Sequence, residues 1–292
     1  MAETQPNETT EKEIHALHLA LDEGHLGAIS RIINGIPGSE AAMFLESLPG
    51  DKRYQVWELI DESCRGEVLV SLHDEVRDSL IEHLDTDELV DATRDLDLDD
   101  MADIIVDLPE EVSNELMLSM DKTSRDMLHQ VLSYPEDSAG GLMNPDVLRV
   151  RTDVNVDVVL RYLRFRENIP KPIGDLFAVG RKGHYKGRVP LETLLACDPK
   201  TPIRDIVDED APAIMDTTHA SEVAQDFEHN DWMSAPVINE KNQLSGRITI
   251  DDVVDVIREE AERSVMRMAG LDEEGDMFAP IISASKRRAV WL

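Results

Sequence analysis

The stretch KGRVPLET, residues 186–193, decides the fold, because it recurs as SGRITIDD at residues 245–252. The glycines of the two copies, Gly187 and Gly246, lie 59 positions apart. In both copies the glycine precedes a short strand-like run, which leads into residues that suit the start of a helix. The chain therefore contains an internal repeat of about 60 residues.

The similarity between the two copies extends upstream. Strand-like apolar runs correspond at the same spacing, and amphipathic helical segments correspond as well (176–179 with 235–238, and 156–163 with 221–227). The segments RKGH (181–184) and EKNQ (240–243) carry residues typical of hairpin turns. Each copy thus predicts the order strand, helix, strand, turn, strand, helix.

The region before the repeat, from about Glu13 to Val131, consists of short amphipathic segments interrupted by prolines. Apolar residues recur at steps of three and four, which predicts helices. Several segments open with a side chain that accepts hydrogen bonds, so we expect these residues to be N-caps (Ser39, Asp51, Thr86 and Asp99). Helices this short bury an apolar face only by stacking on their neighbours, which predicts an all-α helical superhelix.

The chain is strongly acidic. Among 292 residues, 61 Asp and Glu stand against 29 Lys and Arg, a formal net charge of −32. The 41% of hydrophobic residues indicates about two globular domains and not a disordered acidic tail. The charge argues against nucleic acid and anionic lipid as general partners. Two isolated cysteines suit a reducing cytosol, and neither a signal peptide nor an apolar run of ~18–20 residues is found.

Part of the acidic surplus repeats at helical spacing. Asp99 and Asp103 are four positions apart and Asp252 and Asp255 are three apart, so each pair shares one face of a helix. Like charges so placed repel each other, and a divalent cation would turn that repulsion into attraction. Mg²⁺ and Ca²⁺ prefer such oxygen ligands. The alternative is that these faces are simply solvated.

The C-terminal segment changes sign. After an acidic loop at 272–276, the basic cluster KRR (286–288) precedes the apolar residues AVWL (289–292), where the sequence given stops. A basic cluster followed by Trp and aliphatic residues is typical of a cytoplasmic entry into a membrane. The alternative is an ordinary basic end of a helix.

The segment SAGGLM (138–143) joins the acidic helical region to the repeat. The repeat resembles a tandem CBS-domain module, and the chain from about residue 13 to 292 is similar to the MgtE family of magnesium channels and transporters. The resemblance implies an α+β multidomain fold: an all-α N domain, a tandem CBS (α/β) pair and a C-terminal connecting, or plug, helix. The implied boundaries are a disordered terminus (1–12), the N domain (13–133), the CBS domains (134–200 and 201–262) and the connecting helix (263–292).

The resemblance also implies a role and partners. The chain would be the cytosolic Mg²⁺-sensing part of a magnesium channel or transporter, at the cytoplasmic face of the inner or plasma membrane. Its partners would be a second copy, through the CBS domains, and its own transmembrane domain, which is absent from this chain. Bound Mg²⁺ would stabilise a compact closed state and so gate the pore by negative feedback.

The resemblance assigns the ligands of the ion one position at a time. Seven acidic residues fall on Mg²⁺ positions of the family (Glu67, Asp99, Asp103, Asp231, Asp252, Asp255 and Glu260). We expect that Ca²⁺ or Mn²⁺ substitutes for Mg²⁺. Two departures from the family pattern stand out, because His219 and Ser221, and then Arg263 and Ser264, replace acidic residues. We therefore expect at least one ion site to be weakened or absent.

A CBS pair has a second known use, the binding of adenine nucleotides. Its usual element is Gly-x-x-Ser/Thr-x-x-Asp, which the second copy retains as Gly246, Thr249 and Asp252. The first copy has Pro190 and Thr193 in place of the two polar residues. The alternative function is therefore a soluble CBS-type sensor of ATP or AMP that regulates a protein partner. Motifs of common enzymes, such as the P-loop and HExxH, do not occur, so we do not expect an enzyme.

Overall fold

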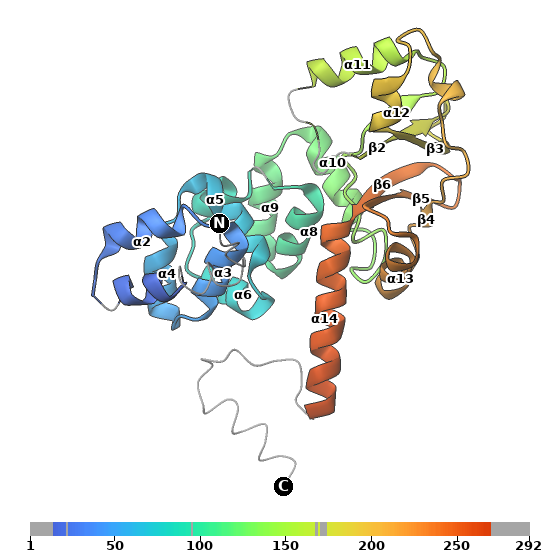
Figure 1. The fold of residues 1–292 in the computed structure, drawn as a ribbon. Coiled ribbons are helices and arrows are strands. Elements are labelled where there is room, and N and C mark those ends of the chain that lie inside the picture. Colours follow the sequence, from blue (N-terminus) through green and yellow to red (C-terminus); the bar gives the residue numbers. More distant parts are fainter. Residues whose placement is uncertain (1–13, 22, 95, 167–168, 170–173, 270–292) are drawn as a thin grey trace, which may run out of the picture. The chain divides into compact units, whose positions relative to one another are not determined.

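The structure is a computed structural model that describes residues 14–269, apart from residues 22, 95, 167–168 and 170–173 (Figure 1). The predicted disordered terminus, the part of the predicted connecting helix beyond residue 269 and the basic cluster at 286–288 lie outside the described residues. The described chain divides into two compact units. Unit 1 comprises residues 14–96 and 104–120, and unit 2 comprises residues 97–103 and 121–269.

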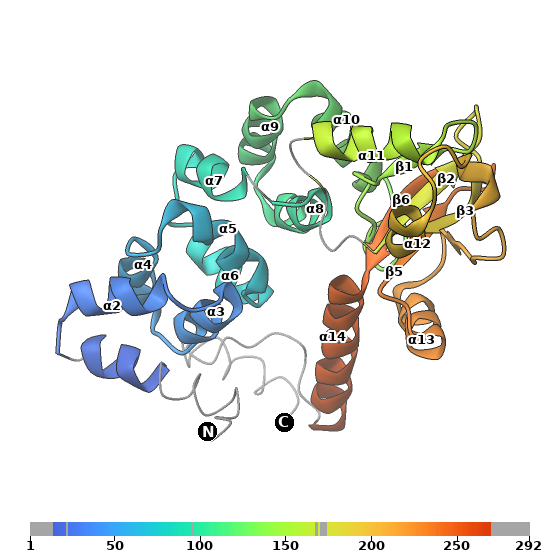
Figure 2. The same ribbon diagram turned by 45° about the horizontal axis from the view of Figure 1, so that its top comes forward.

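Unit 1 is a succession of short helices (Figure 2). After a helical segment at 14–21, this part of the chain forms α2 (Leu26–Ile33), α3 (Gly38–Glu46), α4 (Gly50–Trp57), α5 (Glu62–Ser71), α6 (Asp74–Ile81), α7 (Thr86–Thr93), α8 (Leu98–Asp107), whose start belongs to unit 2, and α9 (Glu110–Ser119). Alternate helices pack together, α3 on α5, α5 on α7 and α7 on α9, while α4 packs on both α3 and α6. This arrangement in two rows confirms the predicted helical superhelix.

The predicted N-caps are wrong by one or two residues. A proline occupies the N-cap position of α3 and α4 (Pro37 and Pro49), and Asp85 caps α7 by accepting a hydrogen bond from the Glu88 backbone N–H. The predicted residues instead lie inside the first turns of their helices (Ser39, Asp51, Thr86 and Asp99). Proline has a backbone angle that suits a helix start and needs no N–H there, so the prolines mark these entries.

Unit 2 contains two similar α/β units that follow α10 (Lys122–Val131). The first consists of β1 (Arg149–Arg151), α11 (Val156–Phe165), β2 (Asp175–Val179), β3 (Tyr185–Pro190) and α12 (Leu191–Ala196). A 3-10 turn (Ile203–Asp205) leads to the second, with β4 (Ile214–Met215), α13 (Ala220–Asn230), β5 (Ser234–Ile238), β6 (Leu244–Thr249) and α14 (Ile250–Ala269). The order strand, helix, strand, strand, helix confirms the repeat predicted from the sequence.

The two sheets have the same topology. Their strand orders are β1-β2-β3 and β4-β5-β6, and in each the first pair of strands is parallel and the second antiparallel. The two hairpin turns contain Gly183 and Asn242, both at positive φ (78° and 56°), and each sheet has a register shift beside its turn. Both turns lie where the sequence predicted them, because positive φ favours Gly and Asn.

The segment that precedes each α/β unit lies on the sheet of the other unit. Asp208, which comes before β4, exchanges two backbone hydrogen bonds with Arg188 of β3 (3.2 and 2.8 Å). Asn144, which comes before β1, exchanges two with Arg247 of β6 (2.8 and 3.0 Å). We call 138–147 and 203–208 the exchanged segments. They tie the two α/β units together through the backbone.

The repeated glycines make room for this exchange. A Cβ atom on Gly187 would lie 2.2 Å from the Asp208 carbonyl oxygen, and one on Gly246 would lie 2.7 Å from the Asn144 carbonyl oxygen. Gly187 also has a φ of 131°, a conformation that side chains disfavour. The glycines that revealed the repeat are therefore explained by close backbone contact.

The exchanged segments also complete the two cores. Ala139 and Met143 of the SAGGLM segment are fully buried against α13 and the β4–β6 sheet. Ile203 is fully buried in the core that α11 and α12 form with the β1–β3 sheet. The α14 helix continues from β6 through Ala269 without a break at the predicted start of the connecting helix. Among the described residues, no helix is both long and apolar enough to cross a membrane.

Candidate cation site

The start of α8 contacts the second α/β unit within unit 2. The buried amide of Asn144 donates a hydrogen bond from Nδ2 to Oδ1 of Asp99, at 3.2 Å. Partial loss of hydration raises the pKa of Asp97, while the charge of Arg247 and a hydrogen bond from Asn144 lower it. Asn144 and Arg247 therefore hold two carboxylates at the start of α8 against the edge of β6.

A third carboxylate of the cluster begins α14. Oδ2 of Asp252 accepts hydrogen bonds from the backbone N–H and the hydroxyl of Thr249, at 3.0 and 2.8 Å. Because Asp252 is the third residue of the helix, its contact with the N–H that precedes the helix is half of a capping box. The predicted nucleotide residues Thr249 and Asp252 thus have a structural role as well, and the buried Gly246 contacts the exchanged segment.

The carboxylates of α8 and α14 lie close enough to repel one another. Burial and then the charge of Asp252 raise the pKa of Asp99 well above its usual range. Burial and the same charge raise the pKa of Asp100 to about 7. Burial raises the pKa of Asp252 to about 6, although its hydrogen bonds from Thr249 act in the opposite direction. We call Asp97, Asp99, Asp100, Asp251 and Asp252 the acidic cluster.

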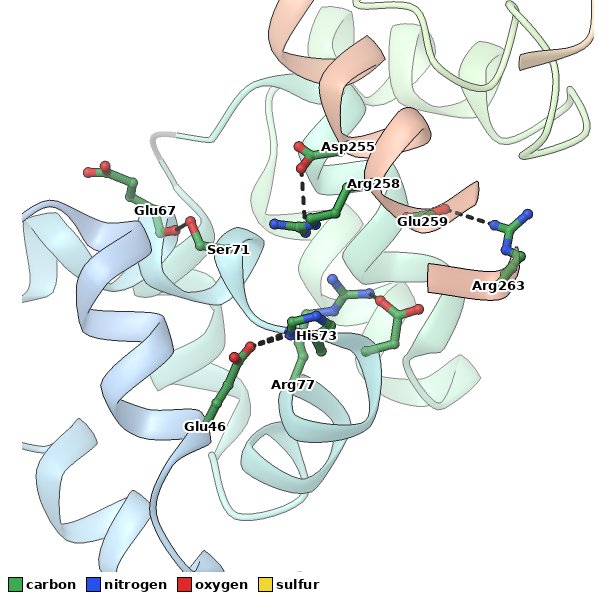
Figure 3. A network of polar contacts seen from close by, with 10 residues as sticks. Glu46, Glu67, Ser71, His73, Arg77, Asp255, Arg258, Glu259 and Arg263 are labelled. Carbon is green, nitrogen blue, oxygen red and sulfur yellow. Dashed lines mark hydrogen bonds and ion pairs between the residues drawn. The ribbon is translucent and has the colours of Figure 1, made fainter. Parts of the chain in front are cut away.

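The remaining acidic residues predicted on α14 lie on its exposed surface. Asp255 forms an ion pair with Arg258 at 3.4 Å (Figure 3). Glu260 is exposed. Partial loss of hydration raises the pKa of Asp255, and Arg258 lowers it. Arg263, one of the departures from the family pattern, pairs with Glu259 at 2.8 Å. Ion pairs along the helix thus satisfy part of the charge that the sequence assigned to metal binding.

The other predicted ligands have separate surroundings. Asp103 is exposed on α8, and its charge contributes to the raised pKa of Asp100, after burial and the charges of Asp252 and Asp97. Asp231 ends α13 in a left-handed conformation (φ 52°). Glu67 lies on α5 in unit 1, where its Oε1 accepts a hydrogen bond from the Gly38 N–H at 3.2 Å. The structure therefore brings Asp99 and Asp252 together but leaves Asp231 in a local role as a helix C-cap.

The departure at the start of α13 has a clear local role. His219 is the N-cap of this helix, and its Nδ1 accepts a hydrogen bond from the Ser221 N–H at 3.2 Å. Its Nε2 lies 3.2 Å from a carboxylate oxygen of Asp137. His219 and Ser221 thus form a helix cap at a place where the family pattern has acidic residues.

Sequence reasoning missed several members of the acidic cluster. It did not select Asp97, Asp100 or Asp251, nor the amide of Asn144 that reaches two of the carboxylates. Three of the four residues at 97–100 are acidic, and this density could have indicated the cluster. Helical spacing instead selected the helix face that Asp99 and Asp103 share. Among the described residues, no three or more His, Cys, Asp or Glu side chains are arranged to hold a metal ion by themselves. An ion in the cluster would need water molecules among its ligands, as Mg²⁺ usually keeps.

Among the described residues of the first α/β unit, the equivalent place carries an ion-paired arginine and not an acidic cluster. Nε of Arg188 lies 3.1 Å from Asp208, and its Nη1 lies 3.8 Å from Asp175. Pro190 is the N-cap of α12. A shallow pocket of about 420 Å³ lies beside the two hairpins and is lined by Tyr185, Lys186 and Asn242, among others. None of the predicted metal or nucleotide ligands lines this pocket.

Comparisons with known proteins bear on this architecture. The model of the MgtE intracellular N domain matches residues 36–137, and the CBS domain model matches residues 203–259. The crystal structure of the cytosolic domain of the Mg²⁺ channel MgtE in complex with ATP is similar to this chain at 30% identity, with a TM-score of 0.75. That similarity covers 83% of this chain and 99% of the solved one. The chain belongs to the MgtE family.

Other MgtE proteins give the extent of the relationship. The magnesium transporter MgtE of Thermus thermophilus is 30% identical over 274 residues, which is 90% of this chain. That of Enterococcus faecalis is 28% identical over 160 residues, or 55% of this chain. The chain spans 59% and 35% of the length of these two relatives. The soluble part of a magnesium transporter, at 19% identity and a TM-score of 0.71, has the same fold.

Proposed function

We propose that this chain is the cytosolic Mg²⁺-sensing regulatory region of a magnesium channel or transporter. The observation that carries the proposal is the effect of Asp252 on Asp99: after burial, the charge of Asp252 is the largest cause of the raised pKa of Asp99. Two segments distant in sequence thus meet through repelling carboxylates, and a divalent cation would remove that repulsion. Membership of the MgtE family supports Mg²⁺ as the physiological cation.

The donor set of the acidic cluster fits Mg²⁺. Carboxylate oxygens are hard ligands, and Mg²⁺ takes one or two of them directly while keeping several waters. Asp99, Asp100 and Asp252 would supply the inner charge, and Asp103, Asp255 and Glu260 would extend the negative field along α8 and α14. Such open sites would bind weakly, and Ca²⁺ or Mn²⁺ would substitute. Glu67 and Asp231 would serve further sites.

Regulation would follow from the position of the cluster at the start of α14. This helix leads from β6 away from both sheets, toward the residues that would connect to a membrane domain (Figure 1). Bound Mg²⁺ would hold α14 and the start of α8 together and favour a compact closed state. Low Mg²⁺ would leave the carboxylates repelling one another and favour opening. The transported ion would thereby limit its own entry.

A homodimer through the CBS domains would transmit this change to both halves of a pore. The outer face of α11 carries Val158, Tyr162 and Phe165 at helical spacing, and Phe165 is 86% exposed. Leu195 of α12, in the same α/β unit, is also exposed. Apolar side chains gathered on two helices in this way support an interface with a second copy.

Thermal unfolding in increasing MgCl₂ tests the sensing role. Binding to the folded form raises the melting temperature, by about 5 °C or more at 100 times the Kd. The double variant Asp99→Asn/Asp252→Asn should lose most of this rise. The control Asp126→Asn/Asp210→Asn makes the same change in net charge at exposed positions and should keep it. NaCl at matched ionic strength controls for screening, and an unchanged melting temperature up to tens of millimolar MgCl₂ (a range generous for sites this open) would contradict the proposal.

Nucleotide sensing is the second candidate function. The similar crystal structure of an MgtE cytosolic domain is described as a complex with ATP. In this chain the second α/β unit offers Gly246, Thr249 and Asp252, while the first has Pro190 and Thr193 at the two polar positions. Calorimetric titration with ATP in EDTA would show binding through this half-site, and Thr249→Val should weaken it. Absence of heat at millimolar ATP would remove this candidate.

A further inference from the structure

Every polar group of Asn144, in its backbone and in its side chain, forms a hydrogen bond. Its side chain belongs to a residue that is only 2% exposed. The amide nitrogen donates to Asp99 at 3.2 Å. The amide oxygen accepts the Asp146 N–H at 2.9 Å. That oxygen needs a donor and the nitrogen needs acceptors, so the network itself fixes the orientation of the amide.

The backbone of Asn144 is fixed to the same strand that carries the rest of the cluster. Its N–H and C=O both pair with Arg247 of β6. Two residues further along, β6 ends at Thr249, which holds the carboxylate of Asp252. The strand β6 therefore fixes the positions of both Asn144, which binds Asp99, and Thr249, which binds Asp252. The place of Asp99 relative to Asp252 is set through the side chain of Asn144.

We propose that Asn144 is a positioning residue of the cation site, an inference that rests on the proposed function. Its amide is an uncharged donor that holds Asp99 beside Asp252 before a cation arrives, against their mutual repulsion. The hydrogen bond occupies one of the several acceptor positions of the carboxylate, so that others remain for a cation or its water. Asn144 therefore lowers the cost of assembling the site, as preorganised groups do in binding sites generally.

The equivalent residue of the first α/β unit shows why an amide is needed. Asp208 occupies the same place in its exchanged segment, with the same pair of backbone hydrogen bonds. Its side chain is a carboxylate bound to Arg188, so it accepts hydrogen bonds and cannot donate any. A carboxylate at position 144 would repel Asp99, whereas the asparagine attracts it.

A double-mutant cycle tests the proposal on the full 292-residue chain. The affinity for Mg²⁺ is measured by calorimetry with MgCl₂ for the unsubstituted protein, Asn144→Ala, Asp99→Asn and the double variant. Asn144→Ala should weaken binding about three- to tenfold, the range for a partly screened hydrogen bond to a charged group. In the Asp99→Asn background it should add less than about twofold, because both changes remove the same interaction. Asn230→Ala, which removes an exposed asparagine contact on α13, should leave the affinity unchanged.

Hydrogen exchange in EDTA gives a readout that a merely structural role would not produce. In Asn144→Ala, the amides of residues 98–103 should exchange faster while those of β6 keep their protection. Faster exchange in both places would indicate general loosening and would overturn the proposal. Asn144→Ser keeps one donor, folds around the same backbone pairing, and should give intermediate values in both measurements. It replaces Asn144→Ala in the cycle if the alanine variant does not fold.

The remaining outcomes separate this inference from the function on which it rests. Equal losses of affinity in both backgrounds, or no loss from Asn144→Ala, overturn the role of Asn144 while leaving Mg²⁺ sensing intact. If the unsubstituted protein binds no Mg²⁺, the proposed function fails and the role of Asn144 in cation binding fails with it.

Discussion

The two CBS units have the same backbone at the point where the exchanged segments cross, but different side-chain chemistry. In the first unit Asp208 and Arg188 pair both through the backbone and through their charges. In the second unit Asn144 and Arg247 pair through the backbone only, and their side chains face the carboxylates that begin α8. The crossing in the first unit carries an internal ion pair, whereas in the second unit the amide of Asn144 donates to a carboxylate of α8.

The difference shows how a duplicated unit changes its side-chain chemistry without a change of fold. Where the first unit has the carboxylate of Asp208, the second has the amide of Asn144, which can donate a hydrogen bond. The amide donates to Asp99, and the charge of Arg247 lowers the pKa of Asp97. The backbone scaffold is preserved because the close contact at Gly187 and Gly246 depends on glycine and not on the side chains beside it.

The largest effect should come from breaking the shared backbone feature. Gly187→Ala places a Cβ atom 2.2 Å from the Asp208 carbonyl and forces a side chain into positive φ, so we expect a loss of about 3–5 kcal/mol in the free energy of unfolding. Gly246→Ala, with a contact of 2.7 Å and no positive φ, should lose about 1–3 kcal/mol. Urea denaturation measures both. Gly174→Ala is the control, because its Cβ would contact nothing within 4 Å.

A smaller effect should distinguish the two CBS units by the pH dependence of the free energy of unfolding. Asp100 and Asp252 have pKa values of about 7 and about 6 in the folded protein, above the usual value near 4. The folded state therefore binds more protons than the unfolded state within this window, and stability falls as the pH rises from 4 to 7. Without divalent cations, we expect a loss of about 2 kcal/mol between pH 5 and pH 7.5, after allowing for solvent screening.

Two variants check the origin of this pH dependence. Asp100→Asn should flatten the profile measured by urea denaturation, and saturating MgCl₂ should flatten it as well. Asp208→Asn, in the first unit, should leave the slope unchanged. A profile that stays steep in Asp100→Asn would show that other groups titrate in this range.

The smallest effect is a pair of stability changes with opposite signs, one for each CBS unit. Asp99→Asn removes a repelled charge and should stabilise the cation-free protein by about 1 kcal/mol. Asp208→Asn removes an attracted charge and should destabilise it by about 0.5–1 kcal/mol, since the pair with Arg188 is partly exposed. Thermal unfolding in EDTA compares them directly. Shifts of the same sign would mean that the two crossings are electrostatically alike.

The predictable parts of the fold are the elements that follow from local periodicity in the sequence. The repeated strands, helices and hairpins follow from patterns within each copy, and Gly183 and Asn242 occupy turns for reasons visible in the sequence. The N-caps were misplaced because prolines begin α3 and α4 in place of the polar residues that follow. Asp99 was selected from its spacing to Asp103, yet its nearest partners come from elsewhere in the chain.

The exchange of segments and the role of Asn144 were not predictable from this sequence. The contact between Asn144 and Asp99 joins residues 45 positions apart, and no periodic pattern connects them. Likewise, nothing in the residues around Asp208 or Asn144 indicates that each pairs with the sheet of the other unit. Helical spacing describes which residues share a face, but it does not describe which surface that face meets.

The exchanged segments also set an order of events during synthesis of the chain. The sheet of the first unit lacks the pairing on the outer edge of β3 until residue 208 has left the ribosome, although its own strands are complete at residue 190. The core of the first unit is likewise incomplete until Ile203 has been synthesised. In the second unit the order is reversed. Its exchanged segment, 138–147, is made more than 60 residues before β4 and must remain free to pair with β6. A nascent chain that stalls between 190 and 203 would therefore expose an open strand edge, the kind of surface on which chaperones act and aggregation begins.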